Sequence, residues 1–375
     1  MKKKSTIVSI SERTGFSVST VSRVLNGKAE LARISKSTVE AIQEEAKRCN
    51  YRPSLLAKGL RTSKTDTIGL VIPSMENLYF ANLASTIIRD ARAYGYTTVT
   101  VDTMEDEHNE RNGIESLLAR NVDGIIVTPC GQDPEWLENI NRNIAPVVLI
   151  DRYFNATELS YVCTDNYQGG YEATRYLLNN GHENILCIQG TPYSMPVRER
   201  VRGYIDALRD KGLDARARIV GDSFSIQNGY LETKLALNSP SRPTAIFALS
   251  NTILLGAIKA IKESELVMPD DISAVTFDNN TFLDFIDPPI TRMSQPVNEI
   301  GTLAVKLLLQ SINEKQPMGT HMQLQPQLIV CDSVANILLK AEQTAWRPRC
   351  RLHAQPIEQK VRQSQQGAQQ TPAAR

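Results

Sequence analysis

Residues 5–27 read STIVSISERTGFSVSTVSRVLNG, and this stretch decides how the N-terminal part of the chain folds. Ile7, Ile10 and the alkyl stem of Arg13 fall on one face of a predicted first helix. Gly15 follows, and it is free to take the positive φ that ends a helix. A short amphipathic helix that stops at Gly15 is therefore predicted.

A second helix is predicted directly after the glycine turn. Ser17 is suited to cap its N-terminus. Its apolar residues recur at steps of three and four: Val18, Val21, Val24 and Leu25. Two short amphipathic helices joined by a glycine turn predict a helix-turn-helix.

The other side of the second helix carries small polar residues and one arginine: Ser19, Thr20, Ser22 and Arg23. A helix that enters the major groove of DNA needs such a slim face, with an arginine long enough to reach guanine or phosphate. Two small helices can also pack together in proteins that bind no DNA, so the motif alone is compatible with either interpretation.

Charge favours DNA. Residues 1–64 hold 14 Lys and Arg against 5 Asp and Glu, a balance of +9. The whole chain is +1, so residues 65–375 sum to −8. A basic head on an acidic body is typical of a nucleic-acid-binding module joined to a body that does not bind phosphate backbones.

Residues 50–64, NYRPSLLAKGLRTSK, predict a further short helix that opens at Pro53 and has about two turns. So short a helix is not stable by itself. We expect it to fold only where a twin helix from a second chain and the DNA pack on it.

Length and composition predict a multidomain, ordinary soluble protein of 375 residues, 41% of them hydrophobic. The chain has no apolar run of membrane-spanning length, and MKKKSTIVSIS lacks the apolar core of a signal peptide, so a cytoplasmic protein with no membrane partner is expected. The 6 cysteines lack CxxC spacing and the 4 histidines lie far apart, so neither a metal nor another cofactor is expected.

A third helix is predicted over residues 35–49, and from Thr67 the pattern changes to alternating strands and helices. TIGLVI, TTVTVD, GIIVTP and PVVLID are short strand-like runs separated by helical stretches at 78–94, 107–120 and 133–143. After Asp165 a second set follows: NILCIQG, ARIVGD, AIFALS and ISAVTFD, with helices at 166–180, 198–211, 226–238 and 251–263. The fold class is therefore α/β, with two lobes of doubly wound parallel sheets and a cleft between them.

Polar and aromatic residues follow these predicted strands, where ligands of such sheets bind. A sugar needs this mixture of aromatic faces, carboxylates, amides and guanidinium groups. The residues at these strand ends are Tyr79, Phe80, Asp102, Asp151, Arg152, Asp165, Asn166, Arg198, Arg200, Phe224, Ser250, Asn251 and Asp278. Asp102 and Asp165 could instead only cap the following helices, and Tyr79 and Phe80 could be core residues.

Three segments in series, TVSRVLNG, NYRPSLLAKGLRT and TIGLVIPSMENLYF, closely resemble the lactose-repressor/galactose-repressor family of bacterial transcription regulators. The resemblance runs from Ser5 to Val334. It implies a three-helix DNA-binding head, a hinge helix, and a periplasmic-binding-protein-like core that closes around a small effector.

By this resemblance, Tyr79, Phe80, Arg152, Asp165, Arg200, Phe224, Asn251, Asp278 and Gln295 match effector-contact positions. The residues expected to contact operator DNA are Thr6, Ser17, Val18, Ser19, Thr20, Ser22, Arg23, Asn26, Tyr51, Ala57, Lys58 and Leu60. Val18, Ser19 and Arg23 should read bases. Leu60 should enter the minor groove beside its dimer mate, with Ala57 small enough to let the two hinge helices approach.

Two departures from the family pattern bear on the effector. Ser194 stands where the purine-responsive branch has arginine, and Asn251 stands where many members have aspartate. Arg152 beside Asp151 is similar to sugar-responsive members. A sugar or sugar phosphate is therefore favoured. Induction is commoner among sugar-responsive members of the family, and corepression is the alternative.

The expected domains are a head over 1–52, a hinge over 53–66, a core over 67–340 and a disordered Gln-rich tail over 341–375. The tail has no repeating leucine heptad, which favours a homodimer over a tetramer. The leading interpretation is a repressor of a carbohydrate-utilisation operon. Alternatives are control by a protein co-regulator, a nucleobase or a nucleoside, and a solute-binding protein; no GxSxG, HExxH or Gly-rich phosphate loop supports an enzyme.

Overall fold

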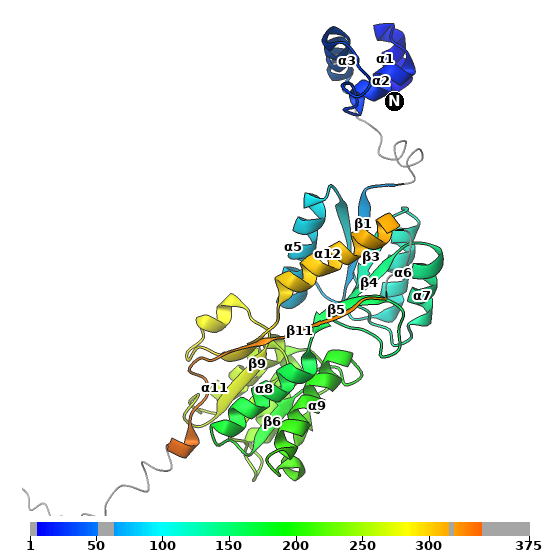
Figure 1. The fold of residues 1–375 in the computed structure, drawn as a ribbon. Coiled ribbons are helices and arrows are strands. Elements are labelled where there is room, and N and C mark those ends of the chain that lie inside the picture. The colour runs from blue at the N-terminus through cyan, green and yellow to red at the C-terminus, as the bar shows by residue number, and fades with distance from the viewer. Residues whose placement is uncertain (1–5, 52–63, 315–318, 340–375) are drawn as a thin grey trace, which may run out of the picture. The chain divides into compact units, whose positions relative to one another are not determined.

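The computed structural model describes residues 6–51, 64–314 and 319–339 (Figure 1). The first range folds into a head of three helices, α1 (Ile7–Thr14), α2 (Val18–Leu25) and α3 (Lys36–Arg48). The side chains of Thr6, Ser17 and Ser35 cap these helices by accepting backbone N–H groups of the first turns. Gly15 ends α1 with a φ of 72°. The predicted helix-turn-helix and third helix are confirmed.

The head encloses a small core of five buried residues, Ile10, Val21, Val24, Ile42 and Ala46. Two residues that the sequence placed on the apolar faces lie elsewhere. Val18 is 46% exposed, and the Arg13 guanidinium pairs with Glu45 at 3.3 Å instead of covering the core. With eight residues, α2 buries only one narrow stripe, and that stripe is centred on Val21 and Val24.

The first lobe is a parallel sheet of six strands in the order β11-β5-β4-β3-β1-β2. The strands are β1 (Thr67–Ile72), β2 (Thr97–Asp102), β3 (Gly124–Val127), β4 (Val147–Ile150), β5 (Ser160–Thr164) and β11 (His321–Leu324). One face packs against α5 (Leu78–Ala93) and α12 (Val297–Glu314). The other packs against α6 (Glu107–Leu118) and α7 (Glu135–Asn143).

The second lobe repeats this plan in the order β12-β10-β9-β8-β6-β7, with only β12 antiparallel to its neighbour. Its strands are β6 (Ile185–Ile188), β7 (Arg218–Val220), β8 (Ala245–Ala248), β9 (Ser273–Phe277), β10 (Thr291–Ser294) and β12 (Gln327–Ile329). Helices α8 (Asn166–Asn179) and α9 (Met195–Arg209) cover one face, and α10 (Ile226–Leu237) and α11 (Asn251–Glu263) cover the other. Two short 3-10 helices complete the lobe, η1 (Asp214–Arg216) and η2 (Thr281–Asp284).

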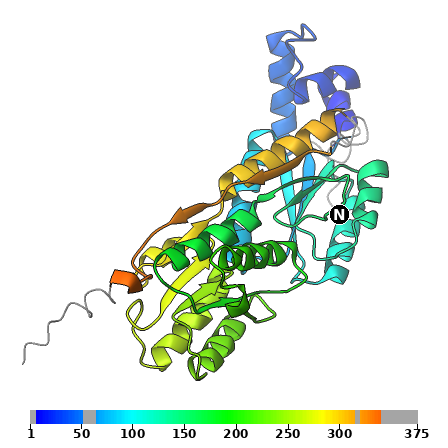
Figure 2. The ribbon, with the colours of Figure 1, turned by 60° about the horizontal axis from the view of Figure 1, so that its bottom comes forward.

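The lobes are interlaced in a way that the sequence analysis did not anticipate. After β10 the chain returns to the first lobe, where α12 lies beside α5 (Figures 1 and 2). It then adds β11 to the first sheet and β12 to the second. The chain thus passes between the lobes three times, after β5, after β10 and after β11. Any change in the angle between the lobes must bend these crossings.

Helix α9 begins at Met195, three residues before the predicted start, and Pro196 lies in its first turn. Proline fits there because a first-turn N–H has no partner inside the helix. Helix α7 begins at Glu135 rather than at residue 133, since the Asp133 carboxylate accepts the Glu135 N–H at 3.0 Å.

Paired glycines let the helices of the second lobe lie close together. A Cβ on Gly170 of α8 would lie 2.2 Å from the carbonyl oxygen of Arg200 in α9, and one on Gly203 would lie 2.3 Å from the carbonyl oxygen of Tyr167. Gly229 of α10 and Gly256 of α11 form a second such pair. Because backbone atoms cannot turn aside as a side chain can, these contacts set the position of α9 and of Arg200.

Gly170→Ala is therefore expected to lower the free energy of unfolding of the core by about 1–3 kcal/mol, since α9 must move outward. Urea titration measures this loss. Gly69→Ala is the control, because its Cβ would meet only side-chain atoms of Leu117. Equal losses in the two variants would contradict the close helix contact.

Candidate DNA-binding surface and effector crevice

The structure places the predicted base-reading residues on the outside of α2. Val18, Ser19 and Arg23 are exposed, while Thr20 and Ser22 are half-buried. Helix α2 contains no acidic residue. Among the described residues, the Arg23 guanidinium has no hydrogen-bond or ion-pair partner. An exposed valine beside a free guanidinium can meet a thymine methyl group and a guanine edge.

The other polar side chains at the two ends of α2 form hydrogen bonds with one another and with nearby backbone groups. The Ser17 hydroxyl accepts the Thr20 N–H at 3.1 Å and lies 2.8 Å from the Ser19 hydroxyl. The Asn26 amide donates to the Ser22 carbonyl at 2.6 Å. These bonds orient a compact polar surface around the start and end of α2.

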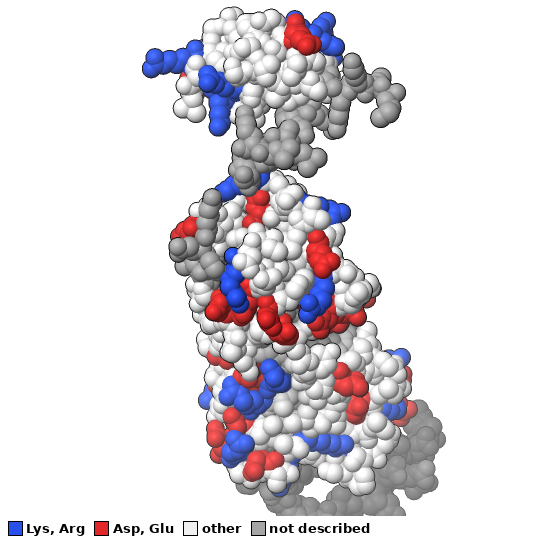
Figure 3. Space-filling view, turned by 90° about the vertical axis from the view of Figure 1, so that its right-hand side faces the viewer, with Lys and Arg blue, Asp and Glu red and all other residues white. Residues whose placement is uncertain are grey.

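Thr6 also takes part in a local bond, because it forms a capping box with Ser9. Tyr51 is half-buried against the head core. Ala57, Lys58 and Leu60 lie outside the described residues. In Figure 3, Lys and Arg side chains and an acidic patch are visible on the head, and both signs of charge alternate over the lobes.

A crevice opens where the carboxyl ends of the strands of the two lobes meet. This inner crevice is lined by Asn77, Tyr79, Phe80, Asp151, Arg152, Ser194, Pro196, Arg200, Phe224, Ser250, Asp278 and Gln295. Seven of the predicted effector residues are among them: Tyr79, Phe80, Arg152, Arg200, Phe224, Asp278 and Gln295.

Polar bonds run across the inner crevice. The Tyr79 hydroxyl donates to Asp151 Oδ1 at 2.8 Å. The Gln295 amide donates to Asp278 Oδ1, and its Oε1 accepts the Thr164 hydroxyl at 2.6 Å. Thr164 and Gln295 both lie at crossings between the lobes, so Gln295 connects the crevice to the crossing that leads into α12.

Arg200 is held on the second lobe by three contacts. Its Nε donates to Asn166 Oδ1 at 2.8 Å, and one terminal nitrogen donates to the Leu249 carbonyl at 2.7 Å. Its guanidinium carbon lies 3.6 Å from the centre of the Phe277 ring. These contacts fix the guanidinium plane before any ligand arrives.

The two aspartates of the inner crevice occupy equivalent places. Asp151 follows β4 and Asp278 follows β9, and both take left-handed backbone angles, with φ of 62° and 78°. Burial raises the pKa of each carboxyl, opposed by Arg152 and Arg200 for Asp151 and by Arg200 for Asp278. Burial and the Asp151 carboxylate also raise the pKa of Tyr79, which keeps its hydroxyl a donor.

We expect the buried Asp278 to make the core less stable as the pH rises. A carboxyl whose folded-state pKa lies above its ordinary value of 3.8 stabilises the fold fully below that value. The contribution is lost as the pH rises through the folded-state pKa. Asp278→Asn removes this contribution, so the stability difference between variant and wild type should grow as the pH rises above the ordinary value of 3.8. Urea titrations across this range would contradict the assignment if the difference stayed constant.

The space left in the inner crevice is about 30 Å³. That volume holds only one or two water molecules. Several of its polar groups are hydrogen-bonded to one another, as in the Tyr79–Asp151 and Gln295–Asp278 pairs, so a sugar must replace these bonds and widen the crevice. Ligand binding and the relative position of the lobes are thereby linked.

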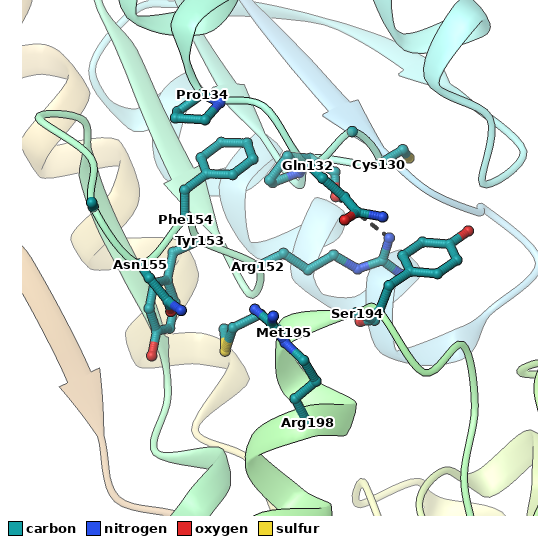
Figure 4. A pocket seen from close by; sticks show the side chains of 14 residues that line it. Cys130, Gln132, Pro134, Arg152, Tyr153, Phe154, Asn155, Ser194, Met195 and Arg198 are labelled. Carbon is teal, nitrogen blue, oxygen red and sulfur yellow. Dashed lines mark hydrogen bonds between the residues drawn. The ribbon is translucent and has the colours of Figure 1, made fainter.

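A second cavity of about 330 Å³ adjoins the inner crevice and shares Arg152 and Ser194 with it. This outer pocket is lined by Pro129, Cys130, Gly131, Gln132, Pro134, Arg152, Tyr153, Phe154, Asn155, Ala156, Tyr193, Ser194, Met195 and Arg198. Arg152 extends toward it from the end of β4, and Arg198 rises from α9 (Figure 4). The predicted effector residue Arg198 thus lies in the outer pocket.

Three predicted effector residues do not line either cavity. Asp102 is exposed and accepts the N–H groups of Met75 and Met104 at 3.0 Å. Asp165 caps α8. These two thus stabilise a helix start and a turn, which agrees with the alternative role that the sequence analysis gave them.

Asn251, the third, is buried directly behind the inner crevice. Its backbone N–H acts to lower the pKa of the Asp278 carboxyl, which burial raises. Neither atom of its side-chain amide has a partner among the described residues.

Asp151 and Ser250 were recognised as strand-end residues but not included in the expected effector set, and Ser194 entered only as a departure from the purine-responsive pattern. The place of Asp151 at the end of a buried strand matches that of Asp278. The described residues contain no cluster of three or more His, Cys, Asp or Glu side chains arranged for a metal ion. In the same residues, no helix has both the length and the apolar character needed to cross a membrane.

Comparison with known proteins agrees with this architecture. The family model of bacterial regulatory proteins of the lacI family matches residues 6–54. The model of periplasmic binding proteins and the sugar binding domain of the LacI family matches residues 65–332.

Individual relatives match over nearly their whole length. Catabolite control protein A of Priestia megaterium is 30% identical over 322 residues, which cover 85% of this chain and 96% of that protein. The HTH-type transcriptional repressor PurR of Pasteurella multocida is 31% identical over 336 residues, covering 89% and 99%. The structure of the lac repressor dimer bound to operator and the anti-inducer ONPF superposes with a TM-score of 0.80 at 25% identity, covering 89% of this chain and 100% of that one. The chain therefore belongs to the LacI family and is a DNA-binding transcriptional regulator.

Proposed function

We propose that this cytoplasmic regulator represses a carbohydrate-utilisation operon and releases its operator when a small sugar or sugar phosphate enters the inner crevice. The observation that carries the proposal is the inner crevice itself. It joins two buried carboxylates and a fixed guanidinium to the aromatic rings of Tyr79, Phe80 and Phe224. Paired hydroxyls bind carboxylates and guanidinium groups, and the apolar face of a sugar ring stacks on aromatic rings.

On the DNA side, we propose that a homodimer places two copies of α2 in successive major grooves. Val18, Ser19 and Arg23 read bases, while Thr6, Ser17, Thr20, Ser22, Asn26 and Tyr51 position the head on the backbone. The hinge expected over 53–66, including the minor-groove wedge at Leu60, falls largely outside the described residues and stays a proposal, as do the other domain limits.

The switch follows from the crossings. A ligand that takes the hydrogen bonds of Gln295 changes its contacts with Asp278 of the second lobe and Thr164 of the first. Because α12 packs on the first lobe directly after Gln295, this change alters the angle between the lobes. A marginal hinge helix then melts, and the heads lose their spacing.

The test has two steps. Genome-wide mapping of bound DNA identifies the operator and the neighbouring genes, and gel shifts with that operator are then repeated with a panel of sugars, nucleobases and nucleosides. We expect carbohydrate genes nearby and release by one sugar or sugar phosphate. Release by a nucleobase alone, or only by a protein captured from lysate, would replace the sugar in this proposal.

A further inference from the structure

We propose that the effector carries a phosphate ester, which binds in the outer pocket while its uncharged hydroxyls occupy the inner crevice. This inference rests on the proposed function, whose ligand it specifies. It is carried by the charges of the two cavities and by polar atoms that the fold leaves without partners.

The two cavities differ in charge. Two arginines and no carboxylate line the outer pocket. Glu105 balances one of them, Arg152, through two hydrogen bonds of 2.8 Å. Arg198 is exposed and has no ion-pair partner among the described residues. The inner crevice is lined by Arg152 and Arg200, but the carboxyl groups of Asp151 and Asp278 offset these two positive charges there. The phosphate end of a ligand is therefore directed to the outer pocket.

Two buried polar atoms shared by the cavities lack partners. Ser194 is 6% exposed and Arg152 is 8% exposed. Within the described part of the chain, the Ser194 hydroxyl and Arg152 Nε make no hydrogen bond. Buried donors left unpaired cost free energy, so a ligand that accepts their bonds is favoured.

Helix α9 adds further donors at the same place. Ser194 is its N-cap residue, yet its side chain makes no capping bond, and Met195 at the start of the helix also lines the outer pocket. Unsatisfied first-turn N–H groups and the helix dipole favour an anion there. Ser194, the α9 N-terminus and Arg198 thus form one donor set on the second lobe, facing Arg152 of the first.

The volumes of the two cavities agree with a phosphate in the outer pocket and hydroxyls in the inner crevice. The outer pocket has about 330 Å³, ample for a phosphate ester, while the inner crevice is nearly filled. Because Arg152 and Ser194 border both cavities, one ligand can extend from one into the other.

The test is isothermal titration of the full-length protein with matched pairs: glucose and glucose 6-phosphate, ribose and ribose 5-phosphate, fructose and fructose 1-phosphate. Inorganic phosphate is titrated separately. We expect the ester of at least one pair to bind about tenfold to a hundredfold more tightly than its parent sugar. Arg198→Ala and Ser194→Ala should bring that ratio close to one. Arg202→Ala, one turn further along α9 and ion-paired with Glu199, should leave the ratio unchanged.

The outcomes separate the inference from the proposed function. Sugars that bind as tightly as their esters would overturn the inference and leave the proposed function standing. If none of the sugars or esters binds, both the inference and the proposed function are overturned. An ester preference that survives in Arg198→Ala and Ser194→Ala places the phosphate elsewhere and overturns the inference. Millimolar inorganic phosphate that competes with the ester in wild type, but not in Arg198→Ala, supports it.

Ser194→Ala removes a hydroxyl without a partner, so its fold should be intact by urea titration.

Discussion

Asp278→Asn is expected to weaken effector binding by about 10–150-fold, the equivalent of a charge-assisted hydrogen bond. The carboxylate is buried between Gln295, Arg200 and the Asn251 N–H, so its position is fixed before a ligand arrives. Asparagine keeps the shape and loses the charge that attracts paired hydroxyls. Gel shifts with rising effector concentration should show a repressor that binds its operator and ignores the effector.

Asp165→Asn is the matched control for this experiment. Asp165 is also an aspartate at a strand end, but it caps α8 and lines neither cavity. Asparagine caps helices as well as aspartate does, so the variant should respond like wild type. If Asp165→Asn lost the response and Asp278→Asn kept it, the inner crevice would not be the effector site.

Arg23→Ala is expected to weaken operator binding by about 1–3 kcal/mol, roughly 5–150-fold, because a bidentate contact with a guanine edge would be lost. The arginine projects from α2 without a partner among the described residues, so its removal should not disturb the head core. Titration of labelled operator and of scrambled DNA at one fixed salt concentration measures the loss, which should be much larger for the operator.

Arg48→Ala controls for charge. Arg48 is an exposed arginine of α3, paired with Glu45 at 2.7 Å. Its removal lowers the charge of the head equally but takes nothing from α2. Equal losses of operator affinity in the two variants would mean that Arg23 acts only as a charge.

Much of the fold could be predicted because local sequence patterns determine where its helices and strands begin and end. Capping serines and Gly15 delimit the head helices, and alternating apolar runs mark most strands and helices of the lobes within a few residues. The return of α12, β11 and β12 across the lobes could not be predicted. The sequences of those segments are like those of any amphipathic helix or short strand. The lobe to which each one belongs depends on the surface against which it packs, which the local sequence does not reveal.

The site residues, too, could be predicted only in part from local sequence. Asp102 and Asp278 both end a strand followed by a loop, and the sequence treats them alike. Strand β2 is the edge strand of its sheet, so Asp102 faces solvent, whereas β9 lies inside its sheet and Asp278 is buried. Strand order in a sheet is not strand order in the chain, so no local pattern could separate these two residues.

By itself, then, the sequence determined the helix-turn-helix, the two α/β lobes, the family, and most of the side chains that line the inner crevice, because periodicity, capping and motif spacing are properties of neighbouring residues. Only the tertiary structure decided that Asp151 pairs with Tyr79, that Gln295 connects the inner crevice to α12, and that Arg198 and Ser194 belong to a separate outer pocket. These contacts join residues of different elements that lie far apart in the chain, so they arise only when the strands and helices have packed together.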